Sequence, residues 1–306
     1  MKRRNFLSTA ATAGFATALF PNCNFMSNPK EKELKISLAQ WSLHKSIFGG
    51  QLAPMDFSQK TKSLGINGVE YVSSFYSHHS DLLEKFSMNE LAKELLKRSD
   101  DNGIDNVLIM IDAQGDLASS DENSRLDAIE NHKKWIDFAA QLGCETLRLN
   151  LSGESELEKW TDNSVKSLTT LANYNSSINV TVENHGGLSS NGAYLANVMS
   201  SVNIKNCGTL PDFGNFCISG SPVGVCNEWY DKYKGVEELM PYAHAVSAKS
   251  YDFDEQGNET TIDFKRMMDI VKNAGYKGYV GIEYEGNRMS EDEGILATKN
   301  LLEKLI

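Results

Sequence analysis

Proline and cysteine are scarce in this sequence, and basic residues are outnumbered by acidic ones. Only 6 of 306 residues are proline and 41% are hydrophobic, which is the composition of a folded chain rather than a disordered one. The 30 basic and 41 acidic residues give a formal net charge of −11. Nucleic-acid affinity depends on Lys and Arg that neutralise phosphates, so we expect no nucleic-acid partner. A neutral small molecule or a cation is compatible with this charge.

The five cysteines include no CxxC pair and no zinc-finger spacing, which excludes a structural zinc site of that kind. An oxidising compartment would permit Cys207–Cys217 or Cys217–Cys226 pairing, and the sequence does not decide between them. Buried free thiols are the default expectation.

Long hydrophobic runs are also missing, and the apolar stretch near the N-terminus is too short to cross a membrane. Arg3 and Arg4 precede Phe6 and a weakly apolar segment, so we interpret residues 1–22 as a twin-arginine-type signal peptide. Residues 23–33 would form a tether. The protein is therefore expected to be exported to the periplasm, with lipid anchoring through Cys23 as an alternative.

From residue 34 onward, strand-like apolar runs alternate with longer helical patterns such as residues 88–102, 123–142 and 262–274. The spacing of about 30 to 40 residues is that of one βα unit. The sequence therefore predicts a single α/β domain, a (β/α)8 TIM barrel over residues 34–306, with an open doubly wound sheet as the rival. The eight predicted strands are residues 36–41, 68–72, 106–112, 145–150, 180–184, 208–213, 243–249 and 279–284. The connection over residues 213–241 is expected to be an active-site loop.

Carboxylates stand at the ends of three of these strands. Side chains alternate between the two faces of a strand, which places Glu183 and His185 on one face and Glu283 on the inward face of the last strand. Asp212 ends the run between them. Three inward carboxylates repel one another unless a divalent cation, which prefers oxygen ligands, lies between them.

Several short motifs at the strand ends resemble the xylose isomerase-like TIM-barrel superfamily, in its sugar phosphate isomerase/epimerase branch. They occur in the order Gly68-Val-Glu-Tyr71, Val182-Glu-Asn-His-Gly-Gly187, Pro211-Asp-Phe-Gly-Asn215, Ala248-Lys-Ser-Tyr-Asp252 and Gly281-Ile-Glu-Tyr-Glu-Gly286. The resemblance covers residues 36–306 and implies the barrel fold and one divalent ion, Mn, Mg, Co or Zn. It assigns Glu183, Asp212 and Glu283 as metal ligands.

The resemblance also implies a histidine two residues before Lys249, where this chain has Ser247. His244 lies at an odd offset from that position and is expected to point to the opposite face. His185 or water is the candidate for the fourth ligand.

The implied chemistry is isomerisation or epimerisation of a carbohydrate by removal of a proton next to a carbonyl, through an enediolate that the cation stabilises. Glu183 and Glu283 would accept and donate the proton, and Lys249 would donate a hydrogen bond to the carbonyl oxygen. An unphosphorylated sugar or glycoside is expected, because sugar phosphates are scarce outside the cytoplasm. Candidate substrate-binding residues at the other strand ends are Trp41, His44, Glu70, Asp112, Arg148 and Asn150.

The sequence leaves several alternatives open. Arg148 could pair with Glu70 or Glu183 instead of substrate, and Lys249 with Asp212 or Glu283. His78 and His79 are expected at the surface, facing solvent or substrate. The same site could cleave a 3-keto-glycoside by β-elimination, or the barrel could bind sugars without catalysis. A repair endonuclease is disfavoured by six histidines and the acidic charge. The oligomeric state stays open, with a homo-oligomer possible.

Overall fold

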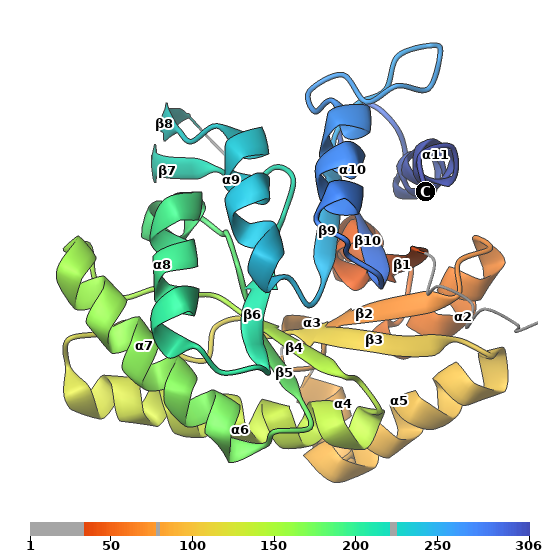
Figure 1. The fold of residues 1–306 in the computed structure, drawn as a ribbon. Coiled ribbons are helices and arrows are strands. Elements are labelled where there is room, and N and C mark those ends of the chain that lie inside the picture. The colour runs from red at the N-terminus through yellow and green to blue at the C-terminus, as the bar shows by residue number, and fades with distance from the viewer. Residues whose placement is uncertain (1–33, 78–79, 221–224) are drawn as a thin grey trace, which may run out of the picture. The chain divides into compact units, whose positions relative to one another are not determined.

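Eight parallel strands form the central sheet of the computed structural model, which describes residues 34–77, 80–220 and 225–306. Their order around the sheet is β6-β5-β4-β3-β2-β1-β10-β9, so strands that follow one another in the chain are neighbours (Figure 1). The strands are β1 (Lys35–Ala39), β2 (Gly68–Val72), β3 (Asp105–Met110), β4 (Thr146–Leu149), β5 (Asn179–Glu183), β6 (Cys207–Leu210), β9 (Val246–Ser250) and β10 (Tyr279–Tyr284).

The seam between β6 and β9 closes the sheet into a barrel. Thr209 forms a parallel bridge with Ala243, and Asp212 forms one with Ser247. Ser247 donates its N–H to Pro211 O at 3.0 Å, and Phe213 donates its own to Ser247 O at 3.1 Å. The prediction of a single-domain TIM barrel is confirmed.

Helices cover the outside of the barrel, and α5 to α7 lie along β3 to β5 (Figure 1). The α-helices are α1 (His44–Phe48), α2 (Phe57–Ser63), α3 (Ser74–Ser77), α4 (Ser80–Lys85), α5 (Met88–Asn102), α6 (Glu122–Leu142), α7 (Leu157–Tyr174), α8 (Gly192–Val202), α9 (Lys232–Leu239), α10 (Phe264–Asn273) and α11 (Glu291–Glu303). Short 3-10 turns are η1 (Gln40–Leu43), η2 (Pro54–Asp56), η3 (Gly187–Ser190) and η4 (Met240–Tyr242). In the part of the chain that is described, none of these helices has the length and apolarity to cross a membrane.

Helix α5 shows how local sequence sets these boundaries. Ser87 and Glu90 form a reciprocal capping box at its start, which satisfies two backbone N–H groups that lack helical partners. Gly103 ends it in the left-handed conformation, with φ of 63°, where a side chain would be strained. The predicted range of residues 88–102 matches the observed helix.

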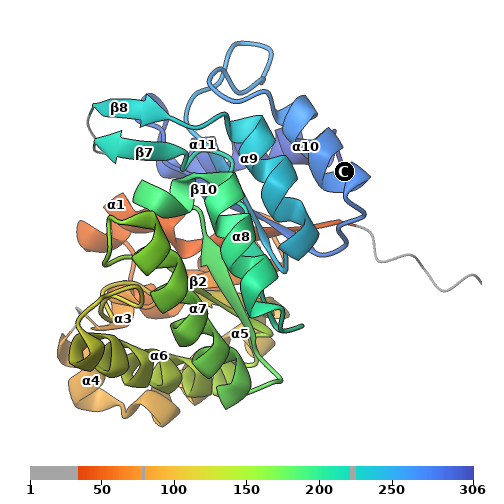
Figure 2. The same cartoon turned by 60° about the vertical axis from the view of Figure 1, so that its left-hand side comes forward.

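The connection over residues 213–241 is not the plain loop that we expected. It contains an antiparallel hairpin, β7 (Cys217–Gly220) with β8 (Cys226–Trp229), followed by the barrel helix α9. A disulfide joins Cys217 to Cys226, which corrects the expectation of free thiols for these two residues. Cys144 and Cys207 are free and buried. Figure 2 shows the hairpin beside α9 and near one end of α8.

A carboxylate pocket at the ends of β5, β6 and β10

Three buried carboxylates converge where β5, β6 and β10 end. Glu183 is the last residue of β5, Asp212 follows β6, and Glu283 lies near the end of β10. One oxygen from each lies within 4.8 Å of the other two, and at most 3% of each residue is exposed. The structure therefore brings together Glu183 and Glu283, which strand parity placed on the inward face, and Asp212, which was expected at the end of the strand between them.

An ion pair and several hydrogen bonds orient two of these carboxylates. Arg148 Nε lies 2.7 Å from Glu183 Oε2, and Asn215 Nδ2 donates to Glu183 Oε1 at 2.8 Å. Asp212 Oδ1 accepts from the backbone N–H groups of Gly214 and Asn215, at 2.8 and 2.7 Å. The second oxygen of Asp212 is left to face the other carboxylates.

Ser247 stands between Asp212 and Glu283. Its Oγ is 2.6 Å from Asp212 Oδ2 and 2.9 Å from Glu283 Oε2. A hydroxyl carries one proton and can donate to only one of these oxygens. The other oxygen faces a lone pair, which is an unfavourable contact unless a second proton or a cation lies there. Ser247, which stands two residues before Lys249 where the resemblance implies a histidine, therefore places a hydroxyl oxygen between the two carboxylates.

Lys249 supplies positive charge to the same cluster. Its Nζ lies 3.2 Å from Glu283 Oε1, 3.3 Å from Glu285 Oε2 and 4.0 Å from Asp212 Oδ2. Trp41 Nε1 donates a short hydrogen bond to Glu285 Oε1, which ties the end of β1 to this network. Lys249 thus makes the ion pairs with Asp212 and Glu283 that the sequence left open, and also one with Glu285.

Burial dominates the electrostatics of the carboxylates. It raises the pKa of Glu183 to about 7 against the opposing charge of Arg148, and that of Asp212 to about 7 against Lys249. Burial also acts on Glu283, but Lys249, Arg148 and the Ser247 hydroxyl outweigh it and lower its pKa. Burial works against the charge of Lys249, but the surrounding carboxylates hold its pKa well above its usual value. Lys249 is therefore a charged donor at neutral pH, where Glu183 and Asp212 titrate and Glu283 is ionised.

Arg148 links the carboxylates to the wall of the pocket. Besides Glu183, it contacts Asp112 through Nη1 to Oδ1 at 2.7 Å, and Asn150 Nδ2 lies 3.3 Å from the same oxygen. Of the two partners that the sequence left open, Glu70 and Glu183, it is Glu183 that forms an ion pair with Arg148. Asp112 and Asn150 line the cavity together with Arg148.

Glu70 occupies a different level of the barrel. It is 1% exposed, is absent from the lining of the cavity, and its Oε1 accepts from Ser37 Oγ at 2.5 Å. A Cβ at Gly281 would lie 2.3 Å from Glu70 Oε1, so the carboxyl group packs directly on β10. Burial raises its pKa to about 8, partly offset by the Ser37 bond.

Of the three carboxylates, Glu283 lines a cavity of about 700 Å³, which is large enough for a small-molecule ligand, and Glu183 and Asp212 lie behind this wall. Trp41 and His185 line it, and His44 stacks on Trp41 with ring centroids 4.9 Å apart, outside the lining. His185 is exposed to the cavity, and enclosure there, followed by the charges of Arg148 and Lys249, lowers its pKa. It is not in the three-carboxylate cluster, so its role as a fourth ligand stays a prediction.

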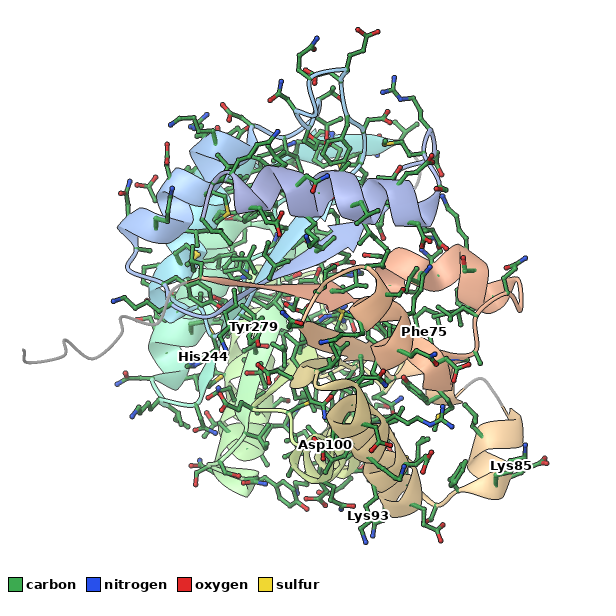
Figure 3. The ribbon with its side chains drawn as sticks, turned by 90° about the vertical axis from the view of Figure 1, so that its right-hand side faces the viewer. Phe75, Lys85, Lys93, Asp100, His244 and Tyr279 are labelled. Atoms are coloured by element: carbon green, nitrogen blue, oxygen red, sulfur yellow. A yellow bond between two sulfur atoms is a disulfide. The ribbon has the colours of Figure 1, made fainter. Side chains whose placement is uncertain are left out.

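His244 lies away from this cavity. Figure 3 places it near Tyr279, the first residue of β10, at the end of the barrel where strands begin. It lines a separate pocket there with Tyr276 and Lys277. His78, His79, the predicted signal peptide, the tether and Cys23 lie outside the described residues.

Sequence reasoning missed three residues of the site. Asn215 donates to Glu183, Tyr251 lines the cavity, and Glu285 pairs with Lys249. Each of the three lies within one of the strand-end motifs that carry the family resemblance, so its place near the site was predictable from the sequence. What the sequence lacked was the identity of their partners, which come from other strands.

The donor set suits a divalent cation. Three buried carboxylate oxygens lie within 4.8 Å of one another. The Ser247 hydroxyl beside them cannot donate to both Asp212 and Glu283. Mg²⁺ and Mn²⁺ prefer oxygen ligands of this kind. Glu183, Asp212 and Glu283 would hold the ion. Among the residues described, this is the group of acidic, His or Cys side chains that meets the geometry.

Comparison with solved structures shows the same fold. D-psicose 3-epimerase, solved with D-fructose, is 14% identical with a TM-score of 0.65 over 89% of this chain and 99% of that one. The IOLI protein with a bound zinc atom is 13% identical with a TM-score of 0.67 over 89% and 97%. The 3-keto-D-glucoside 4-epimerase from E. coli is 12% identical with a TM-score of 0.64 over 82% and 94%.

Sequence comparison gives a shorter match and a longer one. A segment of 64 residues is 38% identical to the C-glycoside deglycosidase alpha subunit of Arthrobacter globiformis, and it spans 21% of this chain and 16% of that protein. Residues 58–305 match the profile of the xylose isomerase-like TIM barrel family. Because that match runs through most of the chain, the protein belongs to the xylose isomerase-like TIM barrel family.

Proposed function

We propose that this protein is an exported, metal-dependent carbohydrate isomerase or epimerase that moves a proton on a carbon next to a carbonyl group. The convergence of Glu183, Asp212 and Glu283 beside Lys249, with Glu283 and Lys249 in the wall of the cavity, carries the proposal. The epimerases among the structural neighbours support a carbohydrate substrate. Export is proposed from the basic and apolar start of the chain, and the Cys217–Cys226 disulfide supports it.

Glu183 and Glu283 are proposed to exchange the proton with the substrate. They come from β5 and β10, which are separated by β6 and β9 around the barrel, so they approach a bound sugar from two walls. A pKa of about 7 lets Glu183 both accept and return a proton near neutral pH. Arg148 and Asn215 hold its two oxygens in place.

Lys249 is proposed to donate a hydrogen bond to the carbonyl oxygen as negative charge develops on it. Its three acidic neighbours keep it charged and fix its Nζ at the cavity wall. A divalent cation at the carboxylates would add Lewis-acid stabilisation of that charge. Trp41, Asp112, Arg148 and Asn150 line the cavity and are proposed to contact the sugar, with His44 supporting Trp41 by stacking on it. Glu70 lies outside the lining, so no contact with the sugar is proposed for it.

Elimination from a 3-keto-glycoside is the second candidate. The deglycosidase relative supports it, because its name describes cleavage of a C-glycoside, in which the bond that breaks joins C1 to carbon. We propose the corresponding step for an O-glycoside. The same base would remove the proton on C2, the C1–C2 double bond would form, and the glycosidic C1–O bond would break. The leaving oxygen would take a proton and depart as the aglycone.

Solvent isotope exchange tests the common step. Ketoses and 3-keto-glucosides incubated with the Mn²⁺-loaded protein in deuterated water should gain deuterium next to the carbonyl, as seen by NMR. Glu183→Gln should reduce exchange at least 1,000-fold, about 4 kcal/mol of barrier. Glu237→Gln, an exposed glutamate on α9, serves as the matched control and should exchange as the wild type does.

The products then separate the candidates. An isomeric sugar indicates isomerase or epimerase activity, and a released aglycone indicates elimination. Ligand binding without any exchange of a substrate C–H proton would refute both and leave a non-catalytic sugar-binding barrel. Unchanged exchange in Glu183→Gln would remove Glu183 as the base.

A further inference from the structure

We propose that Trp229, on the disulfide-linked β7–β8 hairpin, forms an outer subsite for a second ring that is joined to the reacting sugar through a glycosidic oxygen. The inference rests on the proposed function, since it takes the reacting sugar to lie at the three carboxylates. It assigns the protein a glycoside as substrate rather than a free monosaccharide.

Trp229 is a large apolar side chain that is exposed to solvent. It is 59% exposed, although it is the largest side chain of the hairpin and the end residue of β8. A large apolar ring left to solvent at the edge of a binding cavity is a common feature of ligand-contacting surfaces. Figure 2 shows the hairpin beside α9, over the end of the barrel that carries the site.

The surface around Trp229 is continuous with the cavity. A recess of about 20 Å³ is lined by Trp229 together with His185, Asn215 and Tyr251, and these three also line the main cavity. The recess is too small to enclose a ring, since one water in the liquid occupies about 30 Å³. A ring bound there would therefore lie over Trp229, with the reacting sugar deeper in the cavity.

The root of the hairpin is fixed to the barrel, so Trp229 is held in place. Phe216 is fully buried, and a Cβ at Gly235 of α9 would lie 2.1 Å from its ring. Tyr230 donates its N–H to Phe216 O at 2.9 Å. Cys217, bonded to Cys226, pairs with Trp229 across the two strands. Stacking of a ligand ring on Trp229 would consequently require little ordering of the hairpin backbone.

The chemistry of the recess fits a ring with one flat apolar face and polar edges. Trp229 offers the apolar face, and His185, Asn215 and Tyr251 offer polar groups around it. Gly214 permits the approach of Tyr251, because a Cβ there would lie 2.7 Å from the Tyr251 hydroxyl. Both an aryl aglycone and a second sugar have such a face.

Calorimetric titration of the Mn²⁺-loaded protein with methyl glucoside, phenyl glucoside and cellobiose tests the subsite. We expect phenyl glucoside, cellobiose or both to bind about tenfold more tightly than methyl glucoside, equivalent to about 1.4 kcal/mol. Trp229→Ala should abolish this preference and leave the Kd for methyl glucoside within about twofold. Trp229→Phe should retain part of the preference, because it keeps an aromatic face.

Tyr174→Ala, an exposed aromatic on α7, is the matched control and should bind all three ligands as the wild type does. Preference for phenyl glucoside alone identifies an aryl aglycone, and preference for cellobiose alone a second sugar. Equal affinities in the wild type, or a preference that survives in Trp229→Ala, would overturn the subsite, whereas the proposed function is decided separately by the solvent isotope exchange. Failure of all three to bind would overturn the subsite and count against a carbohydrate ligand.

Discussion

Glu70 is a carboxyl group that the barrel keeps away from water and from the cavity. Ser37 is the hydrogen-bond donor that the structure gives it, and its Oε2 has no partner. Its pKa of about 8, against an ordinary value of 4.5, means that folding favours the protonated form. The stabilisation is fully present below about pH 4.5 and is lost as the pH rises through about 8.

Glu70→Gln should therefore flatten the dependence of stability on pH. The amide cannot ionise but keeps an acceptor for Ser37. Between pH 6 and pH 8 the wild type should lose about 2–3 kcal/mol of unfolding free energy that the variant does not lose. Urea denaturation in the presence of a chelator measures both. Parallel pH profiles in the two proteins would show that Glu70 is ionised in the folded state.

Individual site residues were predictable to the extent that strand parity decides them. Alternation placed Glu183 and Glu283 inward, and Arg148 followed because a charged group inside a barrel needs a partner. Alternation could not show that Ser247 bridges Asp212 and Glu283, since that contact joins three strands distant in sequence. The pairing of Arg148 with Asp112 escaped prediction for the same reason.

Close packing between β10 and α11 depends on a residue without a side chain. A Cβ at Gly294 would lie 2.2 Å from Tyr284 Cε1, and Tyr284 is 1% exposed. The helix can therefore approach the strand that carries Glu283 only because Gly294 leaves room for the ring.

Gly294→Ala should destabilise the protein by about 1–3 kcal/mol through overpacking, despite the better helix propensity of alanine. Urea denaturation provides the measurement. Asn300→Ala, at an exposed position of the same helix, should change stability by less than about 0.5 kcal/mol. A Gly294→Ala protein as stable as the wild type would mean that Tyr284 can move aside.

At the scale of elements, regular hydrophobic patterns were predicted well and short irregular ones were not. The helix over residues 88–102 has an apolar face, a capping box and a terminal glycine that agree with one another. The β7–β8 hairpin has four residues in each strand and a largely exposed surface, so burial leaves no periodic pattern in its sequence. Helix α9 was hidden by Gly235, which lowers helix propensity but accommodates Phe216.

For the whole molecule, cation binding should appear as thermal stability. An ion that binds only the folded protein, present at 100 times its Kd, stabilises by about 2.7 kcal/mol. For a domain of this size that corresponds to a rise in Tm of roughly 5–10 °C over the chelated protein, measurable by calorimetry. The double variant Asp212→Asn/Glu283→Gln should show no such rise. Identical Tm values with Mn²⁺ and with chelator in the wild type would refute the metal site.

The seam between β6 and β9 gives a structural reason why cation binding should stabilise the fold. Within the described residues, continuous ladders join the other neighbouring strands of the barrel, whereas β6 and β9 meet through isolated bridges, one of which is Asp212 with Ser247. Asp212 stands on one side of the seam, and Ser247 and Glu283 stand on the other. An ion bound by both Asp212 and Glu283 would link the two sides of this seam, where isolated bridges take the place of a continuous ladder. Closing the fold and assembling the site would then be a single cooperative event, so that an empty barrel opens most easily along the line where its chemistry is located.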